Sequence, residues 1–245
     1  MQNLATGHRT IGVSAFVLHV AAMAAMLCDH LWATLVPGND WLTCVGRLAF
    51  PVFAFMLVEG YCHTNNLKKY ALRLFLFALL SEIPFNLMTG GSIFYPLHQN
   101  VLWTFLISLG LVHWNGKMQD KKLWLRILVG CATVIIGYVA GLLTMVDYLN
   151  AGILTVLVFY FFRQRKWWCY LGQALCLWYI HAEMLGGFGW DLGAFFLPRQ
   201  ALALLALIPI WLYRGKQGHH SRTFQYICYA FYPLHLLILG LAMKL

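Results

Sequence analysis

Long apolar segments joined by short connections constrain this chain more than any other feature. A helix needs about 20 apolar residues to cross the hydrocarbon core of a bilayer. Segments of this kind occupy 10–36, 43–62, 70–89, 99–115, 123–142, 148–162, 167–183, 191–213 and 224–244. We therefore expect an all-α, polytopic membrane bundle of about nine transmembrane helices, built as a single domain over residues 1–245.

The charged residues are too few for a water-soluble surface. They make up 10% of the chain, against 61% hydrophobic residues, whereas soluble domains carry about 25% charged residues. The net charge of +9 could suggest nucleic acid, but the basic residues fall in the short connections between apolar segments. We expect the lipid bilayer as the partner of this surface, and no nucleic acid.

The positions of the basic residues indicate an orientation. They lie in alternate connections, as Arg9, Lys68, Lys69, Lys117, Lys121, Lys122, Arg163, Arg165, Lys166, Arg214, Lys216 and Arg222. The intervening connections contain Asp40, Asp147, Glu183 and Asp191 without Lys or Arg. Cytoplasmic loops of membrane proteins are enriched in Lys and Arg. Nine spans with a cytoplasmic N-terminus satisfy this rule at every loop.

The cysteines indicate neither a disulfide framework nor a metal site. Seven cysteines are scattered through apolar segments, with no CxxC pair and no Cys/His cluster at zinc spacing. Buried, unreactive thiols are the simplest interpretation. We expect no metal.

Ionisable residues inside the apolar segments are the main functional signal. The spans contain Asp29, His30, Arg47, Glu59, Glu82, Arg199 and His235. Each charge at mid-bilayer costs about 2.5–3.5 kcal/mol on insertion scales, so such residues face a bundle interior or a cavity. Two interpretations stay open: these residues form ion pairs that hold the helices together, or they line a polar reaction cavity.

Several segments resemble the TraX family of membrane proteins, known for N-terminal acetylation of F-pilin. The longest is GRLAFPVFAFMLVEGYCHTNNLKKYALRLFLFALLSEIPFNL at 46–87, and MLCDH at 26–30 contains the Asp-His pair. Further matching segments are NVLWTFLISLG, DYLNAGILTVLVFY, YRGKQG and QYICYAFYPLHLLIL, in that order. DYLNAG departs from the usual glycine pattern at Leu149 and Asn150. The matches run from residue 26 to residue 239.

The resemblance implies a membrane-embedded acyltransferase of the bacterial inner membrane. It would move an acetyl group from acetyl-CoA to an amine, such as a peptide or pilin-like N-terminus, or to a hydroxyl. The implied catalytic set is Asp29, His30, Arg47, Glu59, Glu82 and His235. We expect His30 to be the general base, with His235 as the alternative, and Arg47 to polarise the thioester carbonyl or hold a substrate carboxylate.

The acetyl-CoA donor is expected at the basic loops. Their charges can receive its phosphates, and the expected binding residues are Arg214, Lys216, Tyr213 and Arg73. The alternative for these loops is that their charges serve topology only. A proton-coupled small-molecule transporter would also explain buried carboxylates and histidines, although the two halves of the chain show no internal repeat. Binding of acetyl-CoA would distinguish the two classes.

Overall fold

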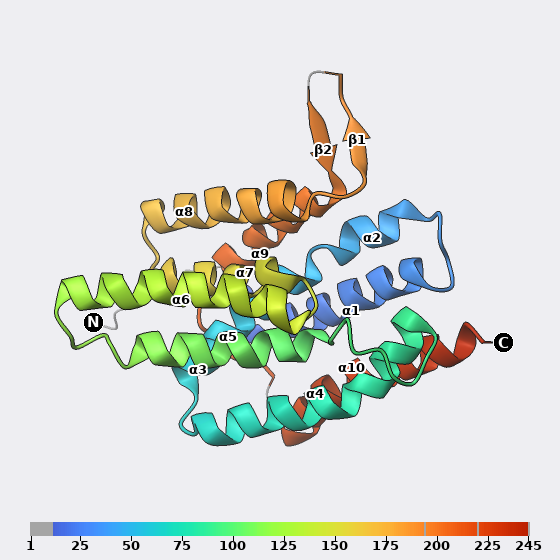
Figure 1. Ribbon diagram of the computed structural model, residues 1–245, viewed down its shortest axis with the longest axis horizontal. Helices are drawn as coiled ribbons and strands as arrows, with labels where there is room; N and C mark the ends of the chain where they lie inside the picture. Colours follow the sequence, from blue (N-terminus) through green and yellow to red (C-terminus); the bar gives the residue numbers. More distant parts are fainter. Residues whose placement is uncertain (1–11, 194, 220, 245) are drawn as a thin grey trace, which may run out of the picture.

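The computed structural model describes residues 12–193, 195–219 and 221–244. Arg9, the start of the first predicted span at residue 10 and the side of the membrane on which the N-terminus lies fall outside the described residues. Helices dominate the rest, and the longer ones run side by side along the long axis of the molecule (Figure 1). The expected mostly helical protein is therefore confirmed.

The helices begin and end close to the predicted spans. They are α1 (Ala15–Ala33), α2 (Asp40–Gly46), α3 (Ala49–His63), α4 (Leu67–Gly90), α5 (Val101–Gly116), α6 (Leu123–Thr144), α7 (Leu149–Phe161), α8 (Trp167–Trp178), α9 (Leu207–Leu212) and α10 (Arg222–Ala242). A π-helix η1 (Tyr179–Leu185) continues α8, and a 3-10 helix η2 (Arg199–Ala206) precedes α9.

Five of the described helices are long and apolar enough to cross a membrane. They are Ala15–Ala33, Asp40–His63, Leu67–Gly90, Leu123–Thr144 and Thr223–Ala242. Shorter apolar helices cover Val101–Gly116, Leu149–Phe161 and Arg199–Leu212. These helices indicate a membrane protein with five candidate long spans in the described part of the chain, and the count of nine stays a prediction.

A break divides the second predicted span. α2 ends at Gly46 and α3 begins at Ala49. Pro51 has no backbone N–H, so the carbonyl of Arg47, four residues earlier, cannot receive its helical hydrogen bond. Pro51 is tolerated because it lies in the first turn of α3. The break leaves Arg47 at a bend between two helices.

The prediction of a helix that begins at residue 191 is wrong for residues 191–193 and 195–198. An antiparallel hairpin of β1 (Gly189–Asp191) and β2 (Phe196–Pro198) stands there and projects crosswise from the bundle (Figure 1). Gly186 and Gly187 have φ of 52° and 90°, which is backbone that ends a helix and that glycine adopts without a steric penalty. Pro198 then leads directly into η2.

The core lies around α7, which is short and buried. Ala151, Ile153, Val156 and Leu157 are at most 1% exposed, and α3, α5, α6 and α8 surround this helix. By contrast, α6 exposes large apolar side chains such as Ile135 at 64%. Apolar exposure on an outer helix is favourable only against lipid, since lipid tails are as apolar as these side chains.

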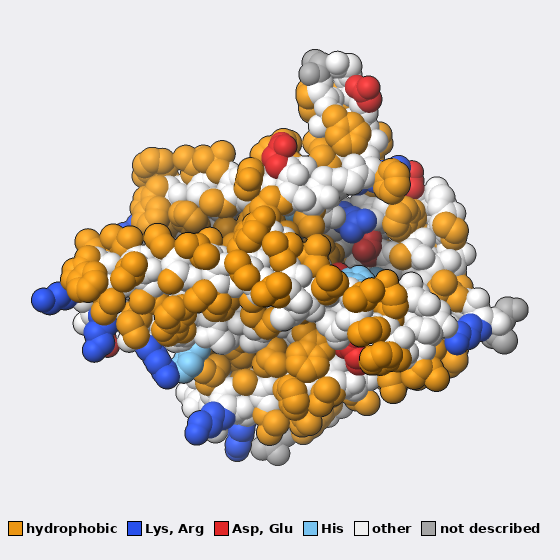
Figure 2. All heavy atoms as spheres, in the orientation of Figure 1, with side chains coloured by type: hydrophobic (Ala, Val, Ile, Leu, Met, Phe, Trp, Pro, Cys, Tyr) orange, Lys and Arg blue, Asp and Glu red, His pale blue; other side chains and the backbone are white. Residues whose placement is uncertain are grey.

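The basic connections gather at one end of the bundle, which we call the inner end. Arg163 pairs with Glu59 at the end of α3, and Arg165 donates to the carbonyl of Tyr213 after α9. Figure 2 shows Lys and Arg side chains around the ends of the helices on that side, with hydrophobic side chains between the two ends. We call the opposite end, which carries the hairpin, the outer end.

The predicted topology can be tested by chemical labelling. In a chain whose seven native cysteines are replaced, single cysteines at Asp120→Cys, Asp191→Cys and Lys244→Cys sample the inner end, the hairpin and the end of α10. With nine spans, a membrane-impermeant maleimide labels positions 191 and 244 in intact spheroplasts and position 120 only after lysis. Labelling of 120 and 244 from the same side would contradict the nine-span topology.

Candidate functional site

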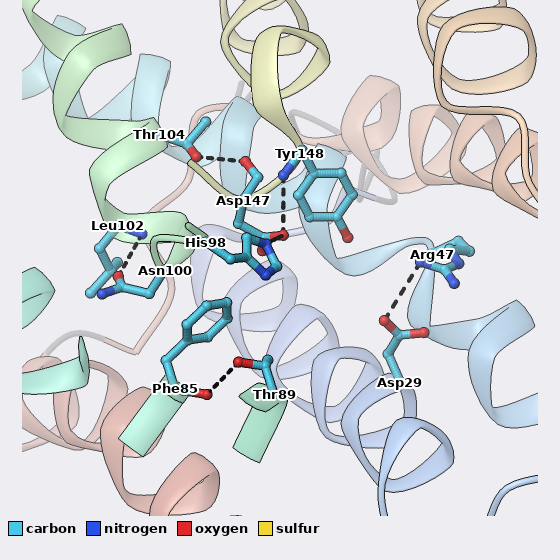
Figure 3. A network of polar contacts seen from close by, with 10 residues as sticks. All are labelled: Asp29, Arg47, Phe85, Thr89, His98, Asn100, Leu102, Thr104, Asp147 and Tyr148. Atoms are coloured by element: carbon cyan, nitrogen blue, oxygen red, sulfur yellow. Dashed lines mark hydrogen bonds and ion pairs between the residues drawn. The ribbon is translucent and has the colours of Figure 1, made fainter. Parts of the chain in front are cut away.

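The outer end of the bundle holds a polar cavity of about 440 Å³, which we call the outer cavity. It is lined by α1, the α2–α3 break, α4, the connections before α5 and α7, and the segment that follows η1. Its acidic, basic and histidine side chains are Asp29, His30, Arg47, His98, Asp147 and Arg199. Figure 2 shows charged and histidine side chains in a hollow below the base of the hairpin, and Figure 3 shows part of their network.

Asp29 is held by α2 rather than by its neighbour in sequence. Its carboxylate accepts a hydrogen bond from Thr43 at 2.7 Å and lies 3.7 Å from Nη1 of Arg47. Gly46 makes this contact possible, because a Cβ at that position would lie 2.3 Å from the Cβ of Asp29. Adjacent residues on a helix point about 100° apart, and the Asp29 carboxylate accordingly contacts Thr43 rather than His30.

His30 instead pairs with His235, the residue expected to be the alternative base. Nδ1 of His30 lies 2.7 Å from Nε2 of His235, and the two rings are nearly coplanar, with 6° between their planes. The pair joins α1 to α10, more than 200 positions apart in the chain. His235 is buried at 6% exposure, whereas His30 lines the outer cavity.

The hydrogen bonds determine where the protons of this pair lie. Nδ1 of His235 is 2.7 Å from the carbonyl of Phe231, and a carbonyl can only accept. Nδ1 of His235 therefore carries a hydrogen, and its Nε2 is the acceptor when the ring is neutral. It follows that His30 donates from Nδ1. The remaining nitrogen of His30, Nε2, then keeps its lone pair and can accept a proton.

A second pair, His98 and Asp147, closes the cavity from two connections. Nε2 of His98 lies 3.4 Å from the Asp147 carboxylate, which also accepts from the backbone N–H of Tyr148 at 3.1 Å. Thr104 donates to the carbonyl of Asp147 and so holds the connection to α5. Tyr148, with φ of 61°, turns its ring toward Arg47 (Figure 3). The hydrogen bond that Nε2 of His98 donates to the Asp147 carboxylate raises the pKa of His98, against the effect of partial burial.

The rim of the cavity is formed by three segments. Nη2 of Arg199, at the start of η2, lies 2.5 Å from Asp40 at the start of α2. Asp40 also accepts from the indole N–H of Trp32 in α1, at 3.3 Å. The guanidinium of Arg199 lies over the ring of Trp190 in the hairpin, 5.7 Å from its centroid. The hairpin is thus attached directly to the mouth of the outer cavity.

A second cavity of about 550 Å³, the inner cavity, opens toward the basic end. Helices α1, α3, α4, α5 and α10 line it together with the connection 213–219. Arg73 of α4 lines it, half-buried and donating to the hydroxyl of Tyr229 at 3.3 Å. The rings of Tyr70 and Tyr229 lie 5.8 and 5.9 Å from the guanidinium of Arg73. An arginine flanked by two tyrosines suits an anionic ligand, because its remaining donors face a cavity.

Glu59 and Glu82, two expected catalytic residues, do not meet the histidine pair. Glu59 lies at the inner end, where it pairs with Arg163 at 2.7 Å and lines the inner cavity. Glu82 accepts hydrogen bonds from Asn100 and from the indole of Trp103, at the start of α5. A carboxylate there is favoured by the partial positive charge of a helix N-terminus. Glu59 therefore joins α3 to the connection after α7, and Glu82 joins α4 to the start of α5.

The expected donor-binding residues divide between the cavity and its surroundings. Arg73 and Tyr213 line the inner cavity, whereas Arg214 and Lys216 are exposed on the connection to α10 and do not line it. That connection is fixed to the start of α1, since the backbone of Ala15 donates to the carbonyl of Lys216. Both basic side chains therefore lie beside the cavity mouth.

Three outer-cavity residues, His98, Asp147 and Arg199, are absent from the expected catalytic set. Asp147 lies in a connection whose acidic charge indicated orientation only, and Arg199 is one of several ionisable residues inside the predicted spans. Asp147 and Tyr148 do open the segment DYLNAG, whose resemblance to a family motif was a usable signal. No sequence pattern places them beside Arg47.

Comparison with known proteins agrees with the motif pattern. The model of the TraX protein family matches residues 14–243. The chain belongs to the TraX family. The expected resemblance is thus confirmed over nearly the whole sequence, and the outer cavity and the histidine pair lie within the matched range. No solved structure matches this TraX-family chain.

A curated relative matches this TraX protein over nearly its whole length. The chain is 26% identical over 246 residues to the probable fimbrial assembly protein FimC, serogroup H1, of Dichelobacter nodosus. The match covers 94% of this chain and 96% of that protein, so the two have nearly the same extent.

We predict that the His98–Asp147 pair stabilises the folded protein in a pH-dependent way. Because the folded-state pKa of His98 is raised, its contribution is fully present below the unfolded-state pKa of about 6.5 and is lost as pH rises through the higher folded-state value. We expect the melting temperature of His98→Gln to fall below that of the wild type at pH 6, and the gap to close by pH 9. His113→Gln is the control. A gap that grows with pH would contradict the charged pair.

Proposed function

We propose that this protein is an acetyltransferase of the bacterial inner membrane that moves an acetyl group from acetyl-CoA to an amine or hydroxyl acceptor. The observation that carries the proposal is the His30–His235 pair, which lies between two cavities that approach it from opposite ends of the bundle. An acyl transfer needs such a base, a donor site and an acceptor site in reach of one another.

The lining of α1 and α10 supports this placement. On α1 the inner cavity is lined from Ala15 to Met26, and the outer cavity begins at Asp29. On α10 the inner cavity reaches Tyr232, three residues before His235. One helical turn is about 5.4 Å, so both inner linings end within about one turn of the histidine pair.

Acetyl-CoA is proposed to enter the inner cavity from the cytosol. The cavity volume of about 550 Å³ falls in the usual range for small-molecule sites, about 300–1,000 Å³. The acidic phosphates would meet Arg73 inside, with Arg214 and Lys216 at the mouth, and the thioester would point toward Tyr232. Nine spans with a cytoplasmic N-terminus would put this mouth in the cytosol.

His30 is proposed to act as the general base through Nε2. The acceptor ammonium first loses one proton to solvent, and the resulting amine attacks the thioester carbonyl as Nε2 of His30 takes its second proton. The new C–N bond forms, the C–S bond breaks, and the CoA thiolate takes that proton from His30 to leave as a thiol. His235 accepts the Nδ1–H hydrogen bond of His30 and so stabilises the transient imidazolium.

The acceptor is proposed to occupy the outer cavity. Tyr148 supplies a hydroxyl donor there for the thioester oxyanion, a class of contact that contributes strongly to acyl transfer. A peptide or pilin-like N-terminus fits the proposal, because the curated relative is a probable fimbrial assembly protein. In this arrangement the acetyl group passes from a cytosolic donor to an acceptor at the outer end.

A proton-coupled transporter is the second candidate. Cavities at both ends of a bundle with a titratable histidine pair between them also suit alternating access. The two functions differ in their ligand. A transporter gives no reason for saturable binding of acetyl-CoA to the purified protein, whereas the acetyltransferase requires it.

If His30 is the general base, its substitution should reduce acetyl transfer without weakening acetyl-CoA binding. His30→Gln should reduce acetyl transfer by about 10²–10⁴-fold while acetyl-CoA binding by calorimetry stays near the wild-type value, since a base acts mainly in the transition state. His235→Gln should have a smaller effect on turnover. His113→Gln on α5, which lines neither cavity, is the matched control. Near-normal turnover in a stable His30→Gln protein would remove His30 as the base.

If acetyl-CoA binds in the inner cavity, Arg73 should contribute more to its affinity than the exposed Arg214 and Lys216. Arg73→Gln should weaken acetyl-CoA binding about tenfold or more, because a charge-assisted hydrogen bond in a cavity contributes about 1.5–3 kcal/mol. The double variant Arg214→Ala/Lys216→Ala should have a smaller effect that diminishes in high salt, since exposed charges are screened over about 8 Å at physiological ionic strength. Unchanged affinity in all of these variants would return the basic loops to a topological role alone.

A further inference from the structure

Two arginines that line the outer cavity have an N–H donor without a hydrogen-bond partner among the described residues. Nε of Arg47 and Nε of Arg199 are buried and have no hydrogen-bond partner among the described residues. Both side chains line the outer cavity, and they are 23% and 20% exposed. An arginine has five N–H donors. A buried donor without a partner is costly, about 1–3 kcal/mol.

The acidic neighbours satisfy these arginines incompletely. Asp29 lies 3.7 Å from Arg47, beyond direct hydrogen-bond distance, and accepts its short hydrogen bond from Thr43. Asp40 does contact Arg199, but its side chain is 47% exposed at the rim. Exposed ion pairs are weak, about 0–1 kcal/mol. A ligand anion can therefore replace or supplement Asp40 on Arg199 at little cost.

The remaining carboxylate of the cavity does not neutralise the arginines. Asp147 is occupied by His98 and by the backbone N–H of Tyr148. The outer cavity thus combines two guanidinium groups, each with an Nε that has no partner among the described residues, with two carboxylates, Asp29 and Asp147, that already accept hydrogen bonds from protein donors. Guanidinium forks match the oxygens of a carboxylate or phosphate, which bind them in pairs.

We propose that the acceptor of the outer cavity carries an oxyanion, a carboxylate or a phosphate, which Arg47 and Arg199 bind between the His30 base and the hairpin. This inference rests on the proposed function, because only an acetyltransferase has an acceptor. The anion site itself requires only the cavity. It narrows the substrate class to amines or alcohols that are negatively charged. Trp190, which stacks on Arg199, holds the guanidinium at the mouth where such a group enters.

Binding of product-like probes to the purified protein in nanodiscs tests the proposal without any acetyl transfer. N-acetylglycine is compared with the neutral N-acetylglycinamide, and N-acetylglucosamine 6-phosphate with N-acetylglucosamine. We expect at least one charged probe to bind about 10- to 100-fold more tightly than its neutral partner, the range for charge-assisted hydrogen bonds. The first comparison identifies a carboxylate and the second a phosphate. Equal affinities within both pairs would overturn the proposal.

Substitutions give opposite expected signs for the two members of the rim pair. Arg199→Gln should reduce the preference for the charged probe to about threefold or less. Asp40→Asn should increase this preference, because the amide releases the guanidinium while keeping an oxygen for Trp32. If the ion pair served the structure alone, binding of the charged probe would weaken in both variants. Arg126→Gln, an exposed arginine of α6 at the inner end, should change nothing. If Arg199→Gln does not fold, Asp40→Asn decides alone, and weaker binding there overturns the proposal.

The two proposals fail separately. A charge preference that depends on Arg199, found in a protein that transfers no acetyl group, supports the anion site and removes the acetyltransferase. Acetyl transfer to neutral amines at the same rate as to charged ones, with no charge preference in binding, removes the anion site and keeps the enzyme.

Discussion

A polar group in the interior of a membrane bundle must find a partner, because neither water nor lipid can replace one. The positions of α1, α2 and α10 follow from this requirement. Asp29 is satisfied by Thr43 on α2, across a contact that Gly46 keeps open, and His30 is satisfied by His235 on α10. These contacts bind the first helix to its neighbours on two sides, and both lie at the end of the outer cavity.

Irregular backbone surrounds that cavity. The α2–α3 break at Arg47, the π-helix before Gly186 and the positive φ of Tyr148 all border it. Non-helical backbone at membrane depth is tolerated where it lines a cavity or is buried in protein, and π-helical turns are frequent at functional sites. The departures from regular helix thus cluster where the charged residues meet, and they aim side chains that a straight helix would direct elsewhere.

The arrangement gives each end of the bundle a distinct character. The inner end combines basic connections with a cavity that contains Arg73, and the outer end combines paired charges with a hairpin that carries exposed aromatic side chains. Between them lies one histidine pair whose proton positions follow from the Phe231 carbonyl. The chain belongs to the TraX family and is similar over nearly its whole length to a probable fimbrial assembly protein.

The sequence by itself determined the helical membrane fold, the long spans and the family, because length, hydropathy and motif order are local properties of the chain. It also singled out Asp29, His30, Arg47 and His235, since an ionisable residue in an apolar segment is visible without coordinates. Only the tertiary structure decided their partners. Adjacent residues on one helix point apart, so Asp29 and His30 separated, while His30 met a histidine 205 positions away. The roles of Glu59, Glu82 and Arg199 depended likewise on neighbours from other helices.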